Sequence, residues 1–152
     1  MKNVIYIMLC LIASTSWMSA RETSDQLAAA LEHAVSLAAS GDLAGCARAI
    51  NAEAKSQKPI KEVSAQADNL KQVYLKLTGL GESDGVERLS MRFLGDSYFR
   101  LRVVDKRAEG AILWTFIGYR FHEQWFCKGM NMNGGDDLMA IMKQKLDAAD
   151  AK

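Results

Sequence analysis

The spacing of apolar residues changes once along this chain, close to Gly85. Before that point apolar residues recur every three or four positions, as they do on one side of an α-helix. After it they alternate with polar residues, as in a β-strand with one buried face. In the first such strand the residues expected on the buried face are Leu89, Met91 and Phe93, which alternate with Arg88, Ser90 and Arg92. Amphipathic helices that precede a sheet are well suited to cover one face of it. The sequence therefore predicts an α+β fold, with N-terminal helices over about 24–78 packed on a curved, cone-like, four-stranded antiparallel sheet over about 86–133.

Short polar segments mark the ends of the predicted helices. Thr23 and Gln26 have the spacing of a capping box, and Gly41 followed by Asp42 predicts the end of one helix and the N-cap of the next. Pro59 suits the first turn of a third helix. The apolar stripe of that third helix consists of Ile60, Val63, Ala67, Leu70, Tyr74 and Leu77.

Short turns separate the predicted strands, and connections of this length imply an antiparallel meander. The third strand is apolar on both faces, which is unusual for a sheet with one face in water. A short C-terminal helix over about 136–149 is one predicted cover for the second face, and another copy of this chain, in a homodimer, is the other. The two faces of this strand carry Leu113, Ile117 and Tyr119 on one side and Ile112, Trp114 and Phe116 on the other.

The first twenty residues have the order of a secretory signal peptide. Lys2 supplies a positive charge, Val4–Ala13 is an unbroken apolar run, and small and polar residues follow. The run is roughly half the ~20 residues that a membrane-spanning helix needs, so no stable anchor is expected. Cleavage after Ala20, with Ser16 as the alternative, predicts a single exported domain over 21–152, periplasmic or secreted.

Charge and cysteine content restrict the partners that this domain is expected to have. The chain holds 19 Lys and Arg against 18 Asp and Glu residues, and loss of Lys2 with the signal leaves the two signs balanced. Such a protein has no excess of positive charge that would attract nucleic acid. Two histidines without regular spacing predict no metal site, and no cofactor is expected. Cys46 and Cys127 are interpreted either as a disulfide or as two buried thiols.

His122 and Glu123 are the one place where an acid–base side chain adjoins a carboxylate. They fall in a predicted hairpin turn, where both would be exposed. An enzyme would have to use these two residues, because the sequence contains no phosphate loop, nucleophile elbow or paired catalytic carboxylates.

Four arginines project from the first two predicted strands and are expected to share one face. A guanidinium fork matches the geometry of a carboxylate or phosphate, so this face is interpreted as a site for an anionic ligand. The alternative is a solvated face whose arginines pair with Glu87 and Asp105. The four residues are Arg88, Arg92, Arg100 and Arg102.

Aromatic placement in the strands resembles that of small exported proteins of the NTF2-like, cystatin-like superfamily. The resemblance rests on Tyr119–Phe121, a polar turn and Trp125, together with Trp114–Phe116 and the Gly41–Asp42 junction, and it covers about 25–133. It implies a cone of helices wrapped by a curved sheet, often dimeric and often with a pocket at the open end.

The same resemblance leaves the activity open, since this superfamily includes isomerases, dehydratases and binding modules. The chain departs from the common layout in two ways. It has no evident strand among its helices, and it lacks the acidic pair or His–Asp arrangement expected of an isomerase or dehydratase. These departures argue against carrying catalysis over to this chain.

The leading hypothesis is a non-catalytic, exported binding or interaction domain that holds a small apolar or amphipathic ligand or a protein partner. The alternative is a small enzyme of isomerase or hydrolase type that uses the cone pocket with His122 and Glu123. A third hypothesis is a protein inhibitor or envelope-assembly factor that acts through an exposed sheet edge, with an envelope protein as its partner. Five residues are interpreted either as the ligand pocket or as plain core packing: Tyr74, Phe99, Trp114, Tyr119 and Trp125.

Overall fold

A computed structural model describes residues 21–54 and 60–134 of the 152-residue chain. The α+β class and the four-stranded antiparallel sheet are confirmed. The predicted signal peptide and the predicted helix over about 136–149 lie outside the described residues. The elements are α1 (Ser24–Ala39), α2 (Leu43–Ala52), α3 (Ile60–Leu77), the 3-10 turn η1 (Thr78–Leu80), β1 (Ser83–Leu94), β2 (Tyr98–Arg107), β3 (Gly110–Phe121) and β4 (Gln124–Gly134).

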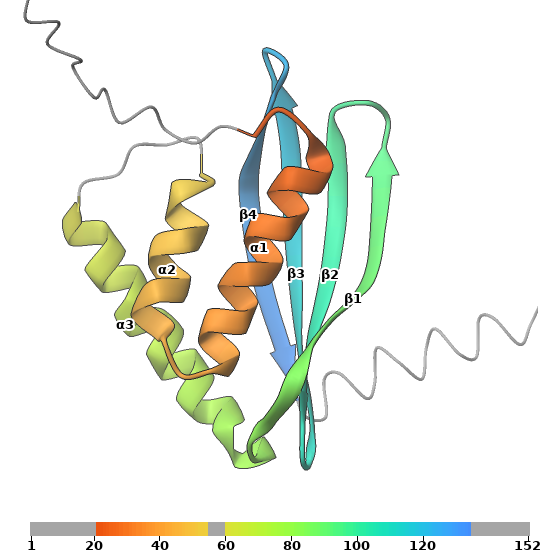
Figure 1. Ribbon diagram of the computed structural model, residues 1–152. Coiled ribbons are helices and arrows are strands. Elements are labelled where there is room, and N and C mark those ends of the chain that lie inside the picture. Colours follow the sequence, from red (N-terminus) through yellow and green to blue (C-terminus); the bar gives the residue numbers. More distant parts are fainter. Residues whose placement is uncertain (1–20, 55–59, 135–152) are drawn as a thin grey trace, which may run out of the picture.

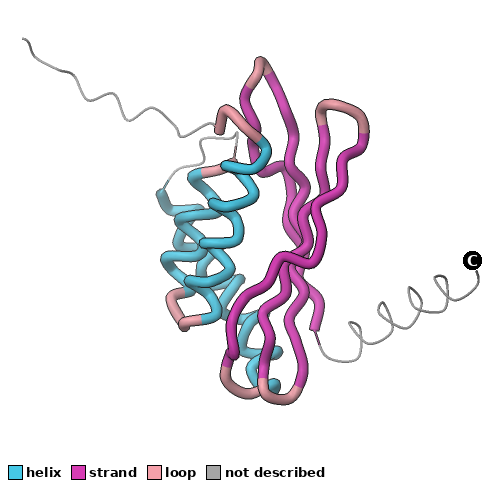
Figure 2. The backbone as a smooth tube through the Cα atoms, turned by 45° about the vertical axis from the view of Figure 1, so that its right-hand side comes forward, coloured by secondary structure: helices cyan, strands magenta, loops and turns pink. Residues whose placement is uncertain are grey.

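The described helices all lie on one side of the sheet (Figure 2). Helix α1 runs along the sheet and contacts all four strands, whereas α2 packs on α1 and α3 packs on α2 (Figure 1). Helix α1 is therefore the layer that joins the other helices to the sheet. Its buried side chains recur at helical spacing and are Leu27, Ala28, Leu31, Ala34, Val35 and Ala38.

The predicted start and end of α1 and the predicted start of α2 are confirmed. The side chain of Thr23 accepts a hydrogen bond from the backbone of Gln26, whose own side chain accepts one from the backbone of Thr23. Gly41 has a φ of 93°, a left-handed conformation that glycine adopts without penalty. Asp42 then caps α2 by accepting from the Gly45 amide at 2.7 Å.

The strands follow one another as neighbours in the order β1-β2-β3-β4, which is the predicted meander. The inner face, which α1 covers, is formed by alternate residues of each strand. Trp114 lies at its centre and is fully buried, between Val103 of β2 and Met132 of β4. The inner face of β2 and β3 consists of Phe99, Leu101, Val103, Ile112, Trp114 and Phe116.

A bulge in β1 changes which side chains share a face. The register with β2 shifts between Arg88 and Ser90, so the alternation on the two sides of Leu89 is out of phase. Arg88 therefore forms an ion pair with Glu32 of α1, and Leu89 is exposed. The predictions that Leu89 faces the core and that Arg88 shares a face with Arg92 are wrong for this reason.

Gly118 allows β3 to approach an aromatic ring of β2 closely. It pairs with Phe99, and a Cβ atom on Gly118 would lie 2.1 Å from a carbon of that ring. Phe99 is itself 1% exposed, so its ring has no free space into which it can move. Glycine is required here by packing.

Replacing Gly118 with Ala should destabilise the fold by about 2 kcal/mol, because Phe99 must leave its rotamer or the strands must separate. Gly129→Ala is the matched control on β4, where an added Cβ meets no atom within 4 Å. Urea unfolding of both variants would measure the difference. Equal stabilities would show that the packing around Gly118 is not tight.

Candidate functional site

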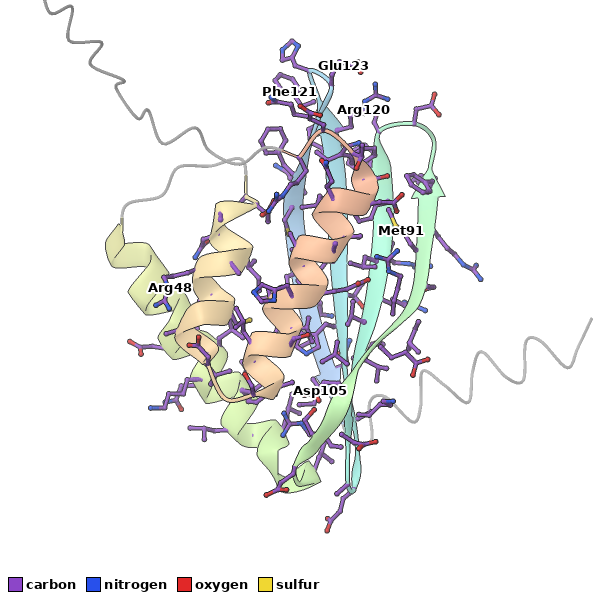
Figure 3. All side chains as sticks on the ribbon, viewed as in Figure 1. Arg48, Met91, Asp105, Arg120, Phe121 and Glu123 are labelled. Carbon is purple, nitrogen blue, oxygen red and sulfur yellow. The ribbon has the colours of Figure 1, made fainter. Side chains whose placement is uncertain are left out.

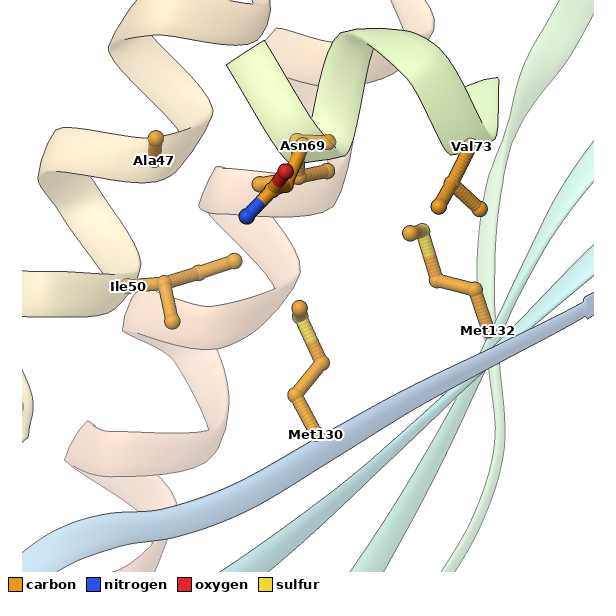
Figure 4. A pocket seen from close by; sticks show the side chains of 7 residues that line it. Ala47, Ile50, Asn69, Val73, Met130 and Met132 are labelled. Carbon is orange, nitrogen blue, oxygen red and sulfur yellow. The ribbon is translucent and has the colours of Figure 1, made fainter. Parts of the chain in front are cut away.

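An apolar pocket lies between α2, α3 and β4 (Figure 4). Its volume is about 200 Å³. Ile50 and Asn69 converge on Met130, while Val73 and Met132 point toward each other. The described residues that line the pocket are Ala47, Ile50, Asn69, Leu70, Val73, Met130 and Met132.

The arrangement of the helices accounts for the position of this pocket. Helix α1 packs directly on the sheet, whereas α3 packs mainly on α2 and meets the sheet through Tyr74 near its C-terminal end. At the level of Leu70 and Val73, α3 therefore lies across from the β4 edge of the sheet with space between them. Met130 and Met132 extend from that edge into the space, because alternate residues of β4 face the helices.

The described wall of the pocket is suited to hold an apolar molecule. Asn69 supplies its one polar side chain, whose amide can donate or accept a hydrogen bond but does not titrate. Methionine side chains are flexible and polarizable, so they adapt to ligands of differing shape. Within the described wall, no side chain is able to act as a general acid or base.

A buried polar cluster lies next to the pocket, toward the C-terminal end of α3. Asp105 of β2 is 0% exposed and accepts hydrogen bonds from Tyr74 of α3 at 3.0 Å and from Ser83 at the start of β1. Arg107 donates to the same carboxylate through Nε at 2.9 Å and Nη2 at 2.7 Å. Its remaining nitrogen donates to the carbonyl of Gly81 at 2.9 Å. This cluster fixes the C-terminal end of α3 to the sheet. Figure 3 marks the position of Asp105.

The interpretation of Asp105 as a solvated partner of the arginine face is wrong. It lies in phase with Leu101 and Val103, which face the core, so the alternation along β2 already predicted an inward side chain. A buried carboxylate needs a paired charge, and Arg107, two residues further, supplies it. Burial, followed by the nearby Asp105 charge, raises the pKa of Tyr74 well above its ordinary value, so its hydroxyl remains a proton donor.

The five residues interpreted as a ligand pocket do not come together in one. Tyr74, Phe99, Trp114 and Trp125 are all buried in the core cluster on the inner face of the sheet. Phe99 and Trp125 are in ring contact at 5.3 Å, whereas Tyr119 lies on the outer face. None of the five lines the pocket between α2, α3 and β4. The first four occupy the positions expected for core packing.

The acid–base candidates lie on the turn between β3 and β4, where both are exposed (Figure 3). His122 and Glu123 are its two central residues, with φ values of 47° and 61°. The ring of His122 meets that of Phe121 edge-on at 4.1 Å, and Glu123 forms an ion pair with Arg120. Neither side chain lines the apolar pocket, so the structure does not combine this pair with a binding site.

Both cysteines of the described chain are buried, free thiols. Burial raises the pKa of Cys46 to about 12, with a smaller contribution from Asp42. Burial also raises the pKa of Cys127, to about 11, although a hydrogen bond with the Gly129 backbone opposes the shift. The structure thus agrees with the buried-thiol interpretation. Because the thiolate is the reactive form, neither residue is suited to nucleophilic or redox chemistry near neutral pH.

The described residues were also compared with the requirements of a metal site and of a membrane-spanning helix. Within residues 21–54 and 60–134, no group of three His, Cys, Asp or Glu side chains is placed to hold a metal ion. No helix in this described part is long and apolar enough to cross a membrane.

Replacing Asp105 with Asn should destabilise the protein by about 3 kcal/mol, because it leaves the buried Arg107 guanidinium without a counter-charge. Chemical unfolding would measure this effect. Glu123→Gln is the control, since it breaks an exposed ion pair and should change the stability by less than about 0.5 kcal/mol. Similar losses in the two variants would contradict a structural role for the buried cluster.

A disulfide-exchange reagent at about pH 8 should leave Cys46 and Cys127 unlabelled in the folded protein, because both pKa values lie well above that pH. Denaturation should expose both to rapid labelling. Rapid labelling of the folded protein would contradict their burial. Failure to label either after denaturation would show that they are joined.

The chain matches no protein-family model, no curated protein and no solved structure. The resemblance to the NTF2-like, cystatin-like superfamily therefore stays a prediction.

Proposed function

We propose that this chain is a non-catalytic, exported binding domain that holds a small apolar molecule between α2, α3 and β4. The observation that carries the proposal is the pocket of about 200 Å³, whose described wall is apolar except for Asn69. Export is proposed from the signal-like order of residues 1–20. A cone-like form of the domain, as the superfamily resemblance implies, belongs to the same proposal.

The size of the pocket sets the size of the ligand. A dry cavity of about 150 Å³ lined by apolar side chains is large enough to bind benzene. The pocket described here is larger, which favours a ligand of about two fused rings or a short branched chain. One polar group on such a ligand would meet the Asn69 amide and fix its orientation.

Binding is favoured over catalysis by the separation of the pocket from titratable groups. The enzyme alternative depends on His122 and Glu123, which lie on an exposed turn outside the pocket wall. A general acid or base has to come within about 3 Å of the proton that it transfers. A ligand held beside Asn69 has no described side chain that meets this requirement.

Titration of the full chain with 2-naphthol, a two-ring probe with one hydroxyl, tests the proposal by calorimetry. A dissociation constant of about 10–100 μM is expected for a ligand of this size. Met130→Glu should weaken binding at least tenfold, because it places a charge in the pocket while its 38% exposure lets the carboxylate reach water.

Leu89→Glu is the matched control, because Leu89 is 46% exposed and lies on β1 at the opposite edge of the sheet. It should bind 2-naphthol as tightly as the unmodified chain. Absence of binding to the unmodified chain at millimolar probe would refute the proposal. Equal weakening by Met130→Glu and Leu89→Glu would also refute it.

A further inference from the structure

Three arginines form a cluster on the outer face of the sheet, opposite the helices. Arg92 of β1 is directly paired with Arg100 of β2, and Arg102 lies two residues further along β2 on the same face, beside Ser90. Residues directly opposite each other in a sheet have Cβ atoms about 5 Å apart, and like charges there repel. The fold thus holds three positive charges close together.

The two carboxylates expected to pair with this cluster, Glu87 and Asp105, do not neutralise it. Glu87 forms an ion pair with Lys106 at 3.7 Å, and Asp105 turns inward to Arg107. No ion pair joins Arg92, Arg100 or Arg102 to an acidic residue within the described ranges 21–54 and 60–134. The alternative interpretation of this face, arginines paired with Glu87 and Asp105, is therefore wrong.

Arg102 is the member of the cluster that most lacks a partner. Its Nε atom is buried and has no hydrogen-bond acceptor. Its pKa is lowered first by loss of hydration and then by the charges of Arg100 and Arg92. A buried donor without an acceptor costs about 1–3 kcal/mol. An oxyanion placed on the cluster would supply the missing acceptor and offset the repulsion.

An apolar row borders the cluster on the side of the hairpin ends. Tyr98 pairs with Leu94 on one side and with Tyr119 on the other, and the two tyrosine rings are 4.9 Å apart. Leu94 is 78% exposed and Tyr98 is 42% exposed, so the row is open to solvent. Ile117 is paired with Arg100 and joins the cluster to this row.

Part of this surface is hollowed into a shallow pocket of about 390 Å³, and Arg102 and Tyr119 lie beside it on the same face. The pocket is lined by Arg92, Phe93, Leu94, Tyr98, Phe99, Arg100 and Ile117. A pocket of this size lies within the range of small-molecule sites. Its charge is concentrated at one end and its apolar surface at the other. A ligand that matches both ends needs an anionic group and an apolar body within one small molecule.

We propose that the outer face of the sheet binds a small amphiphile whose carboxylate or phosphate lies between Arg92, Arg100 and Arg102 and whose apolar part lies on Ile117 and the Tyr98–Tyr119 pair. This site is separate from the pocket between α2, α3 and β4, since the sheet lies between them. It does not depend on the function proposed for that pocket.

The cluster also bears on the hypothesis of a homodimer through the sheet. Two copies related by a two-fold axis at this patch would bring two sets of three guanidinium groups into one interface. Like charges placed opposite each other in an interface cost several kcal/mol. The charge pattern therefore favours an anionic ligand over a second copy as the occupant of this face.

Calorimetric titration with octyl phosphate, octanoate and octyl glucoside, each below its micelle-forming concentration, tests the site. Octyl phosphate and octanoate should bind, and their relative affinities distinguish a phosphate from a carboxylate ligand. Octyl glucoside lacks the anion and inorganic phosphate lacks the chain, so each should bind at least tenfold more weakly. Raised salt should weaken binding of the anionic probes, because their attraction to the cluster is screened.

Arg100→Gln and Arg102→Gln should each reduce the affinity for octyl phosphate at least tenfold. Without ligand, the same variants should unfold at a temperature no lower than the unmodified chain, because each removes a repulsive charge. Arg120→Gln is the matched control: its guanidinium is paired with Glu123 at the hairpin end, so its loss should leave the affinity unchanged. Met130→Glu should also leave it unchanged, since Met130 lies on the other face.

Three results would overturn the proposal. The first is equal binding of octyl phosphate and octyl glucoside, and the second is unchanged affinity in both Arg100→Gln and Arg102→Gln. The third is a stable dimer at micromolar concentration in sedimentation that Arg100→Gln dissociates, which would assign the cluster to an interface between copies.

Discussion

The packing of α1 on the inner face of the sheet is the interaction on which the rest of the structure depends. This helix contacts all four strands, and its buried side chains meet a face centred on Trp114. Burial of apolar surface contributes about 25 cal/mol per Å², and the largest buried side chains among the described residues, Trp114, Phe99 and Phe116, lie on this face. The positions of α2 and α3 depend on α1, because α2 packs on α1 and α3 packs on α2. The inner face of the sheet is therefore covered mainly by α1, and α2 and α3 cover it only in part.

That arrangement gives the two faces of the sheet different properties. On the inner side, α3 is fixed at its C-terminal end by the buried cluster around Asp105 and stands off from β4 further along, which leaves an apolar pocket under Val73. On the outer side, the strands present charged and aromatic rows that the described helices do not cover (Figure 2). The bulge at Leu89 sets the composition of the outer face, because it turns Arg88 toward α1 and leaves Arg92 opposite Arg100. Both candidate binding surfaces are thus consequences of how one helix and one bulge place the strands.

Much of the fold could be predicted from local patterns, because these patterns have local causes. The capping box at Thr23, the left-handed Gly41 and the alternation on β2 all act within a few residues. The pocket could not be predicted, since its wall combines ordinary aliphatic and methionine side chains from α2, α3 and β4 that no sequence motif marks. The predicted aromatic residues belong instead to the core, where large rings bury the most surface. The burial of Asp105 could be predicted from its phase with Leu101 and Val103 on β2, but an acidic side chain is usually assigned to the surface.

The most direct test of a ligand site between α2, α3 and β4 is to record carbon–proton NMR spectra of methyl-labelled methionine during titration with 2-naphthol. Met130 and Met132 line the proposed pocket, whereas Met91 lies on the inner face at the opposite edge of the sheet. If 2-naphthol binds between α2, α3 and β4, the Met130 and Met132 methyl signals should shift together and saturate, while the Met91 signal stays in place. Shifts at Met91 without shifts at Met130 and Met132, or no shift at any of the three, would contradict a ligand site between α2, α3 and β4.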